Sequence, residues 1–142
     1  MRTYNIGILG AGVISRTYLG DIQAFYKKLK VVACADIRIS NAEKLADEYK
    51  ISKAYTVDDL LQDDEIEIVI NLTPPQFHVE LARQIIAAGK HLFSEKPFAP
   101  SVKEAGEILD LAKKMELKLG VLRIRFWHPV CKVCGIILTQ DS

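Results

Sequence analysis

The chain has 142 residues, of which 49% are hydrophobic and 26% are charged, with a formal net charge of +1. This composition predicts one soluble globular domain, and the nearly neutral charge excludes the strongly basic surfaces that bind nucleic acid or anionic membranes. No run reaches the roughly 18 apolar residues of a membrane span. Met1 is followed almost at once by a strand pattern, which leaves no room for a signal peptide. We therefore expect a cytoplasmic protein.

Strand and helix patterns alternate along the chain, which is typical of an α/β fold with helices on both faces of a parallel sheet. The predicted strands are 4–9, 31–35, 53–56, 66–72, 91–94 and 117–122. The predicted helices are 13–28, 41–49, 57–62, 74–88 and 102–115, with Ser40, Thr73 and Ser101 as caps. The handedness of parallel crossovers favours the doubly wound strand order 3-2-1-4-5-6.

A glycine turn separates the first predicted strand from the first helix. Gly10 permits a tight turn, and Gly12 lets the backbone approach a pyrophosphate. The start of the following helix, at Val13 and Ile14, offers backbone N–H groups to the anion. Ser15 stands where a third glycine or alanine is expected, and it is small enough for close packing of helix on strand. The pattern predicts a dinucleotide site.

An acid ends the second predicted strand, where such a site places its ribose-binding carboxylate. Asp36 would accept hydrogen bonds from both ribose hydroxyls and repel a 2′-phosphate, which favours NAD over NADP. Arg38 keeps NADP possible, because an arginine there could hold a 2′-phosphate or stack on adenine. A solvated turn aspartate is the alternative for Asp36. A methyltransferase would also use a glycine turn, but it usually carries an acid where this chain has Leu9.

A lysine follows the fifth predicted strand, between an acid and a proline. Ligands of open parallel sheets bind outside the carboxyl ends of the strands. Lys96, between Glu95 and Pro97, therefore lies where chemistry takes place, whereas most lysines are solvated surface charges. We predict Lys96 as the catalytic residue.

These features resemble the N-terminal Rossmann domain of the glucose–fructose oxidoreductase and inositol dehydrogenase (Gfo/Idh/MocA) superfamily of NAD(P)-dependent oxidoreductases. The most specific motifs are Thr73-Pro74-Pro75-x-x-His78, Gly89-Lys90-His91 and Glu95-Lys96-Pro97. The resemblance implies that Lys96 assists proton transfer beside the nicotinamide and that Glu95 and Pro97 orient it. It also implies that Thr73, Pro74 and His78 line the cofactor crevice. The alternative for His78 is a helix-packing role, and His91 is expected to be structural.

The resemblance covers residues 1–142 as a dinucleotide-binding domain, with 122–142 as a crossover segment. Family members carry a second domain that binds a sugar- or polyol-like substrate and forms homo-oligomers. That domain is absent here, so we expect a fragment or a truncated product. A non-catalytic dinucleotide-binding or sensor module is the alternative to an enzyme.

The aromatic segment 125–129 resembles the family's approach to the nicotinamide pocket, with plain packing as the alternative. Three cysteines do not form a disulfide framework, and Cys34 is expected to be a small buried hydrophobe. Cys131 and Cys134 have the spacing of a zinc half-site, but His128 is the only close further ligand. We expect no metal.

Overall fold

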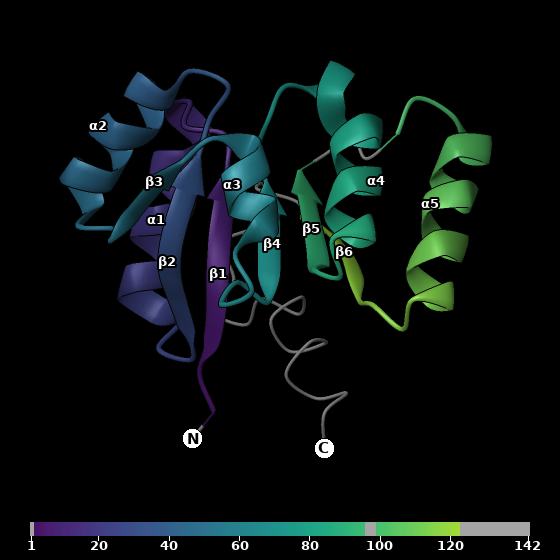
Figure 1. The fold of residues 1–142 in the computed structure, drawn as a ribbon, viewed down its shortest axis with the longest axis horizontal. Coiled ribbons are helices and arrows are strands. Elements are labelled where there is room, and N and C mark those ends of the chain that lie inside the picture. The colour runs from purple at the N-terminus through teal and green to yellow at the C-terminus, as the bar shows by residue number, and fades with distance from the viewer. Residues whose placement is uncertain (1, 96–98, 123–142) are drawn as a thin grey trace.

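The computed structural model describes residues 2–95 and 99–122, and they form one six-stranded parallel sheet between two layers of helices (Figure 1). The strand order is β3-β2-β1-β4-β5-β6, which confirms the predicted doubly wound topology. The strands are β1 (Tyr4–Leu9), β2 (Leu29–Ala35), β3 (Lys53–Tyr55), β4 (Ile68–Asn71), β5 (His91–Glu95) and β6 (Leu119–Leu122). The helices are α1 (Val13–Phe25), α2 (Ile39–Tyr49), α3 (Val57–Gln62), α4 (His78–Ala87) and α5 (Val102–Lys114), with a 3-10 turn η1 (Pro75–Phe77) before α4.

The core lies on both faces of the sheet. One cluster joins the inner faces of α1 and α2 to β1, β4 and β5, through residues such as Leu19, Leu45 and Ile70. The other joins α3, α4 and α5 to the opposite face, through residues such as Leu60, Ile85 and Ile108. Successive side chains of a strand point to opposite faces, so strands buried on both sides must be apolar almost throughout.

Several boundaries differ from the predicted ones because tertiary pairing sets them. Helix α1 ends at Phe25, where the Leu29 N–H bonds the Tyr26 carbonyl in a turn. Strand β2 consequently begins at Leu29, in register with Tyr4 of β1. On α5 the buried residues are Ile108 and Ala112, whereas Val102, which keeps the predicted helical spacing, is exposed.

One of the three predicted caps is confirmed and two are wrong. Ser101 Oγ accepts the Glu104 N–H at 3.2 Å at the start of α5. Helix α2 instead begins at Ile39 with Arg38 as its N-cap, which places Ser40 inside the helix. Thr73 does not cap α4, because the chain first makes the 3-10 turn η1. The Thr73 hydroxyl donates to Asn71 Oδ1 instead.

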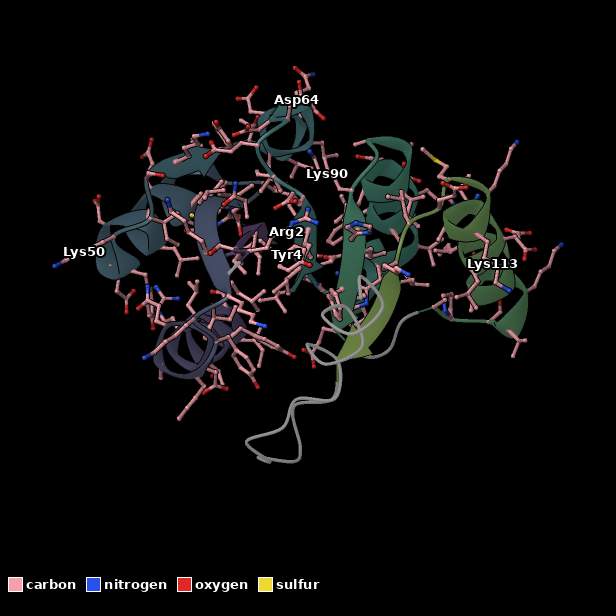
Figure 2. The ribbon with its side chains drawn as sticks, turned by 90° about the horizontal axis from the view of Figure 1, so that it is seen from below. Arg2, Tyr4, Lys50, Asp64, Lys90 and Lys113 are labelled. Atoms are coloured by element: carbon pink, nitrogen blue, oxygen red, sulfur yellow. The ribbon has the colours of Figure 1, made fainter. Side chains whose placement is uncertain are left out.

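A buried lysine holds the amino-terminal edge of the sheet. Lys90 is 4% exposed, and its Nζ donates to the carbonyl oxygens of Asp63 at 2.8 Å and Ile66 at 3.0 Å. Burial lowers the pKa of Lys90. Figure 2, a view from below, labels Lys90 near Asp64. Lys90 therefore anchors the loop before β4, at the edge opposite the predicted site.

His91 has a similar role beside it: its Nδ1 accepts the Lys118 N–H at 2.9 Å, just before β6. This agrees with the expected structural role. Within 2–95 and 99–122, no helix is long and apolar enough to cross a membrane. The same residues contain no cluster of three or more potential metal ligands.

Candidate dinucleotide site

The predicted site residues that the structure describes gather at the carboxyl edge of the sheet. The glycine turn follows β1, Asp36 follows β2, Thr73 lies in the loop after β4, and Glu95 ends β5 (Figure 1). Strands β2, β1, β4 and β5 are consecutive neighbours in the sheet. In a doubly wound sheet the ligand crevice opens between β1 and β4, where the strand order reverses.

Gly10 is required at its position. Its φ is +105°, and a Cβ built there would lie 2.9 Å from the carbonyl carbon and oxygen of Leu72. Its N–H donates to Ala35 O at 2.8 Å. The turn after β1 is therefore held between the ends of β2 and β4, and only a glycine fits.

The backbone conformation of Gly12 could be adopted by any residue. The absence of a side chain there therefore serves a different purpose than at Gly10. It is the N-cap of α1 with φ −79°, and, its chain neighbours aside, no heavy atom of the described residues lies within 4 Å of a Cβ built there. Within the part of the chain that the structure describes, no side chain caps this helix, and Val13 beside Gly12 is 86% exposed. An uncapped helix start with open space above its backbone fits a pyrophosphate, which takes hydrogen bonds from the first-turn N–H groups.

Two residues of the first turn, Ile14 and Ser15, lie on the inner side of α1. Ser15 is fully buried, and its hydroxyl donates to the Gly12 carbonyl. Ile14 packs against the core cluster of α1 and α2. Ser15 thus permits the close approach of α1 predicted for a small residue, and it adds a hydrogen bond that a third glycine would not make.

Asp36 is fixed by two backbone groups. Its Oδ2 accepts the Ala11 N–H at 2.9 Å, and its Oδ1 accepts the Arg38 N–H at 2.9 Å. The first bond links the acid to the glycine turn, so Asp36 is more than a solvated turn aspartate. Arg38 is exposed beside it. Each carboxylate oxygen has a further lone pair for a ribose hydroxyl.

Asn71 was missed by the sequence analysis, although it builds the loop after β4. It is fully buried, and its Oδ1 accepts the Thr73 N–H at 3.2 Å and the Thr73 hydroxyl at 2.6 Å. This is an Asx turn, in which the side chain bonds the backbone two residues on. Its Nδ2 has no hydrogen-bond partner in the part of the chain that the structure describes. A polar residue in an otherwise apolar strand was the available signal.

His78 lies beneath that loop. It is 1% exposed, and its Nε2 is 2.6 Å from the Thr73 carbonyl oxygen. A carbonyl only accepts, so Nε2 carries a proton. Pro74 is exposed on the loop, whereas Thr73 is buried. This geometry matches the helix-packing alternative for His78, which supports the loop from inside.

Glu95 ends β5 and contacts the first helix. The Tyr18 hydroxyl of α1 donates to Glu95 Oε2 at 2.5 Å. Tyr18 had no role in the sequence analysis. Lys96 and Pro97 lie outside the described residues, as do segment 125–129, Cys131 and Cys134.

Comparison with known proteins agrees with this geometry. Residues 4–122, from the start of β1 to the end of β6, match the family described as "Oxidoreductase family, NAD-binding Rossmann fold", the Gfo/Idh/MocA family. The chain belongs to this family. The domain built by β1 to β6 is therefore its NAD-binding Rossmann domain, as the sequence motifs predicted.

Curated relatives of this Gfo/Idh/MocA domain are longer proteins. An uncharacterized oxidoreductase of Schizosaccharomyces pombe is 34% identical over 84% of this chain and 33% of its own length. An inositol 2-dehydrogenase/D-chiro-inositol 3-dehydrogenase of Lactiplantibacillus plantarum is 30% identical over 83% of this chain and 35% of its own. The chain thus spans about a third of the length of these relatives.

A solved structure has the same fold over nearly the whole domain. The NAD-binding oxidoreductase from Klebsiella pneumoniae superposes with a TM-score of 0.79 at 26% identity, covering 98% of this chain and 39% of that one.

One thiol of the Gfo/Idh/MocA domain lies close to Asp36. Cys34 is buried, and its Sγ–H donates to Ala42 O at 3.3 Å. Burial first, and then the charge of Asp36, raises the pKa of Cys34 to about 11. A thiol that stays protonated at neutral pH is a poor nucleophile and metal ligand, so Cys34 is the predicted buried hydrophobe.

Proposed function

We propose that this chain is the cofactor-binding domain of an oxidoreductase that moves hydride between a sugar- or cyclitol-like hydroxyl and nicotinamide. The observation that carries the proposal is the pairing of an open Gly12 with an anchored Asp36 on neighbouring strand ends. One offers space and N–H groups to a diphosphate, and the other offers carboxylate oxygens to a ribose. Together they match the two polar parts of a dinucleotide.

NAD is the cofactor that the site favours. The Asp36 carboxylate would repel a 2′-phosphate, and among residues 2–95 and 99–122 its two hydrogen bonds come from backbone N–H groups rather than from a basic side chain. Arg38 is exposed nearby and would be the residue to hold a 2′-phosphate if NADP bound. When bound, the nicotinamide supplies a hydride acceptor or donor at one end of the crevice.

The proposed proton-transfer residue is Lys96. It follows Glu95 directly, and Glu95 ends β5 at the same edge as the glycine turn. A lysine there would take the proton of a substrate hydroxyl during oxidation and return it during reduction. Thr73 and Pro74 would form the wall of the crevice over β4, because Asn71 and His78 hold their loop in place.

The substrate class rests on the relatives. The Lactiplantibacillus plantarum protein bears the name of an inositol dehydrogenase, which supports a cyclitol- or sugar-like alcohol. Because the chain spans about a third of such relatives, we assign the substrate pocket and homo-oligomer contacts to a second domain outside this chain.

A titration and an assay test the proposal. The 142-residue chain is titrated with NADH by calorimetry, and the full-length protein is assayed with NAD and a panel of cyclitols and aldoses. We expect saturable binding to the chain and reduced nicotinamide from at least one alcohol. Binding without turnover of any alcohol by the full-length protein would favour the non-catalytic sensor module. Absence of binding would refute the proposal.

A further inference from the structure

Tyr18 and Glu95 join two parts of the molecule that are 77 positions apart in the sequence. The Tyr18 hydroxyl donates to Glu95 Oε2 at 2.5 Å. A hydroxyl that donates to an ionised carboxylate makes a short, charge-assisted bond that is stronger than one between neutral groups. Neither residue is more than partly exposed, so water competes for this bond less than at the open surface.

Two repeats bring these side chains together: the helical turn of α1 and the two-residue alternation of strand β5. Tyr18 lies one helical turn after Ile14, and both pack against the core cluster of α1 and α2. Phe93 of β5 belongs to the same cluster, and Glu95 follows it by two positions, on the same face of the sheet. The end of β5 therefore meets the inner side of α1.

We propose that Tyr18 is a positioning residue that fixes Glu95, the last residue of β5, which directly precedes the proposed proton-transfer residue Lys96 in the sequence. This inference rests on the function proposed above. Gly12 and Tyr18 lie on one helix, roughly 9 Å apart along its axis. The same helix would thus bind the cofactor's diphosphate at its start and hold Glu95 in place through Tyr18.

The test variant is Tyr18→Phe, which keeps the packed ring and removes the hydroxyl that donates to Glu95. Tyr49→Phe is the matched control, because the Tyr49 hydroxyl donates to Arg16 O of the same helix at 3.3 Å without contacting Glu95. The first readout is amide hydrogen exchange of β5 in the 142-residue chain. We expect exchange at residues 93–95 to be about 10-fold faster in Tyr18→Phe and unchanged there in Tyr49→Phe.

The second readout separates positioning from binding. In the full-length protein, Tyr18→Phe is expected to lower kcat about 10-fold while KM for NAD stays within about twofold. Glu95→Gln removes the charge and keeps an acceptor. Because Tyr18 and Glu95 share this bond, the double variant Tyr18→Phe/Glu95→Gln should lose little beyond Glu95→Gln alone.

These measurements decide separately whether Tyr18 anchors Glu95 and whether that anchoring affects catalysis. Unchanged exchange at the end of β5 in Tyr18→Phe would overturn the anchoring of Glu95. Faster exchange with unchanged kcat would leave a structural bond and overturn the positioning role. A wild-type full-length protein without turnover would refute the proposed function instead, and the exchange experiment would still decide whether Tyr18 anchors Glu95.

Discussion

The Ala11 backbone N–H donates to Asp36 Oδ2 at 2.9 Å, which joins the turn after β1 to the acid after β2. The acid that would bind the ribose therefore also shapes the turn that would bind the diphosphate. Asp36 Oδ1 accepts a second N–H, from Arg38, at the entry to α2. Substitutions at Asp36 should act on both halves of the site.

The first prediction is that the chain prefers NADH to NADPH. Asp36 offers two charge-assisted hydrogen bonds to an unmodified ribose and repels a 2′-phosphate, so we expect at least about 10-fold tighter binding of NADH. Calorimetric titration with both cofactors measures the ratio. Equal or tighter binding of NADPH would mean that Arg38, not Asp36, sets the preference.

The second prediction concerns Asp36→Ala. We expect NADH affinity to fall by about 10- to 100-fold, because the ribose bonds and the bond to Ala11 are lost together. NADPH should not reach the wild-type affinity for NADH, since removing the repulsion does not restore the turn. Asp47→Ala, an exposed change on α2, is the control. An Asp36→Ala chain that binds NADPH as tightly as the wild type binds NADH would show that the bond to Ala11 is dispensable.

The third prediction separates the two glycines of the turn. Gly12→Ala should fold with nearly unchanged stability, because its Cβ meets no atom, yet bind NADH at least about 10-fold more weakly, because the methyl occupies the approach of the diphosphate. Gly10→Ala should lose about 1–3 kcal/mol of stability, since it puts a Cβ against the Leu72 carbonyl group at positive φ. Thermal unfolding and calorimetry measure both.

Gly20→Ala is the control for these variants, because Gly20 lies on α1 with open space around it. It should gain about 0.5–1 kcal/mol from helix propensity and leave binding unchanged. Tight NADH binding by Gly12→Ala would contradict the assigned diphosphate position.

The sequence predicted the features of this domain that follow from local periodicity. The apolar strands, the amphipathic helices and the right-handed crossover rule together lead to the 3-2-1-4-5-6 order. The roles of Gly10 and Ser15 also followed, because a tight turn and a close helix approach each demand a particular residue size.

The contacts that the sequence could not predict depend on tertiary neighbours. Ser40 and Thr73 have the residue types of caps, but Asp36 sets the entry to α2 and Asn71 takes the Thr73 hydroxyl. The bond between Tyr18 and Glu95 exists only because α1 packs over the end of β5. Where a polar side chain has several possible hydrogen-bond partners, tertiary packing rather than sequence spacing decides which one it bonds.

The fourth prediction is a loss of stability in acid that depends on Asp63. Its Oδ2 accepts from Lys53 Nζ at 2.8 Å and from the Tyr55 hydroxyl at 2.9 Å. The bond from Lys53, more than any other contact, lowers the pKa of Asp63 to about 2. A carboxyl whose pKa is lower in the folded state stabilises the fold above its unfolded pKa, near 4, and loses that effect as the pH falls toward 2.

Asp63→Asn should therefore be less stable than the wild type at pH 6, and the difference should close between about pH 4 and 2. Urea unfolding across this range measures it. Asp64→Asn, at the exposed neighbouring position, is the control. A difference that stays constant down to pH 2 would mean that Asp63 acts through packing or neutral hydrogen bonds rather than through its charge.

The fifth prediction is that the 142-residue chain binds NADH but does not catalyse the oxidation of an alcohol. The glycine turn and Asp36 lie within it, so binding is expected. The affinity should be modest, because we propose that a second domain supplies one wall of the nicotinamide pocket. Catalysis needs hydride donor, acceptor and proton carrier in near-attack geometry, and positioning supplies up to roughly 7–11 kcal/mol of barrier reduction. Without the second domain, a panel of sugars and polyols should give no measurable reduced nicotinamide.

The full-length protein then tests Lys96 itself. Lys96→Ala should lower kcat by about 100-fold or more, because general acid–base catalysis contributes that order of rate, while NADH affinity stays within a few-fold. Lys113→Ala, on the exposed side of α5, is the control for removing a lysine (Figure 2). Robust turnover by the 142-residue chain would refute the two-domain requirement. An undiminished kcat in Lys96→Ala would assign the proton to another group, and Glu95, held at the end of β5 by Tyr18, would be the next residue to test.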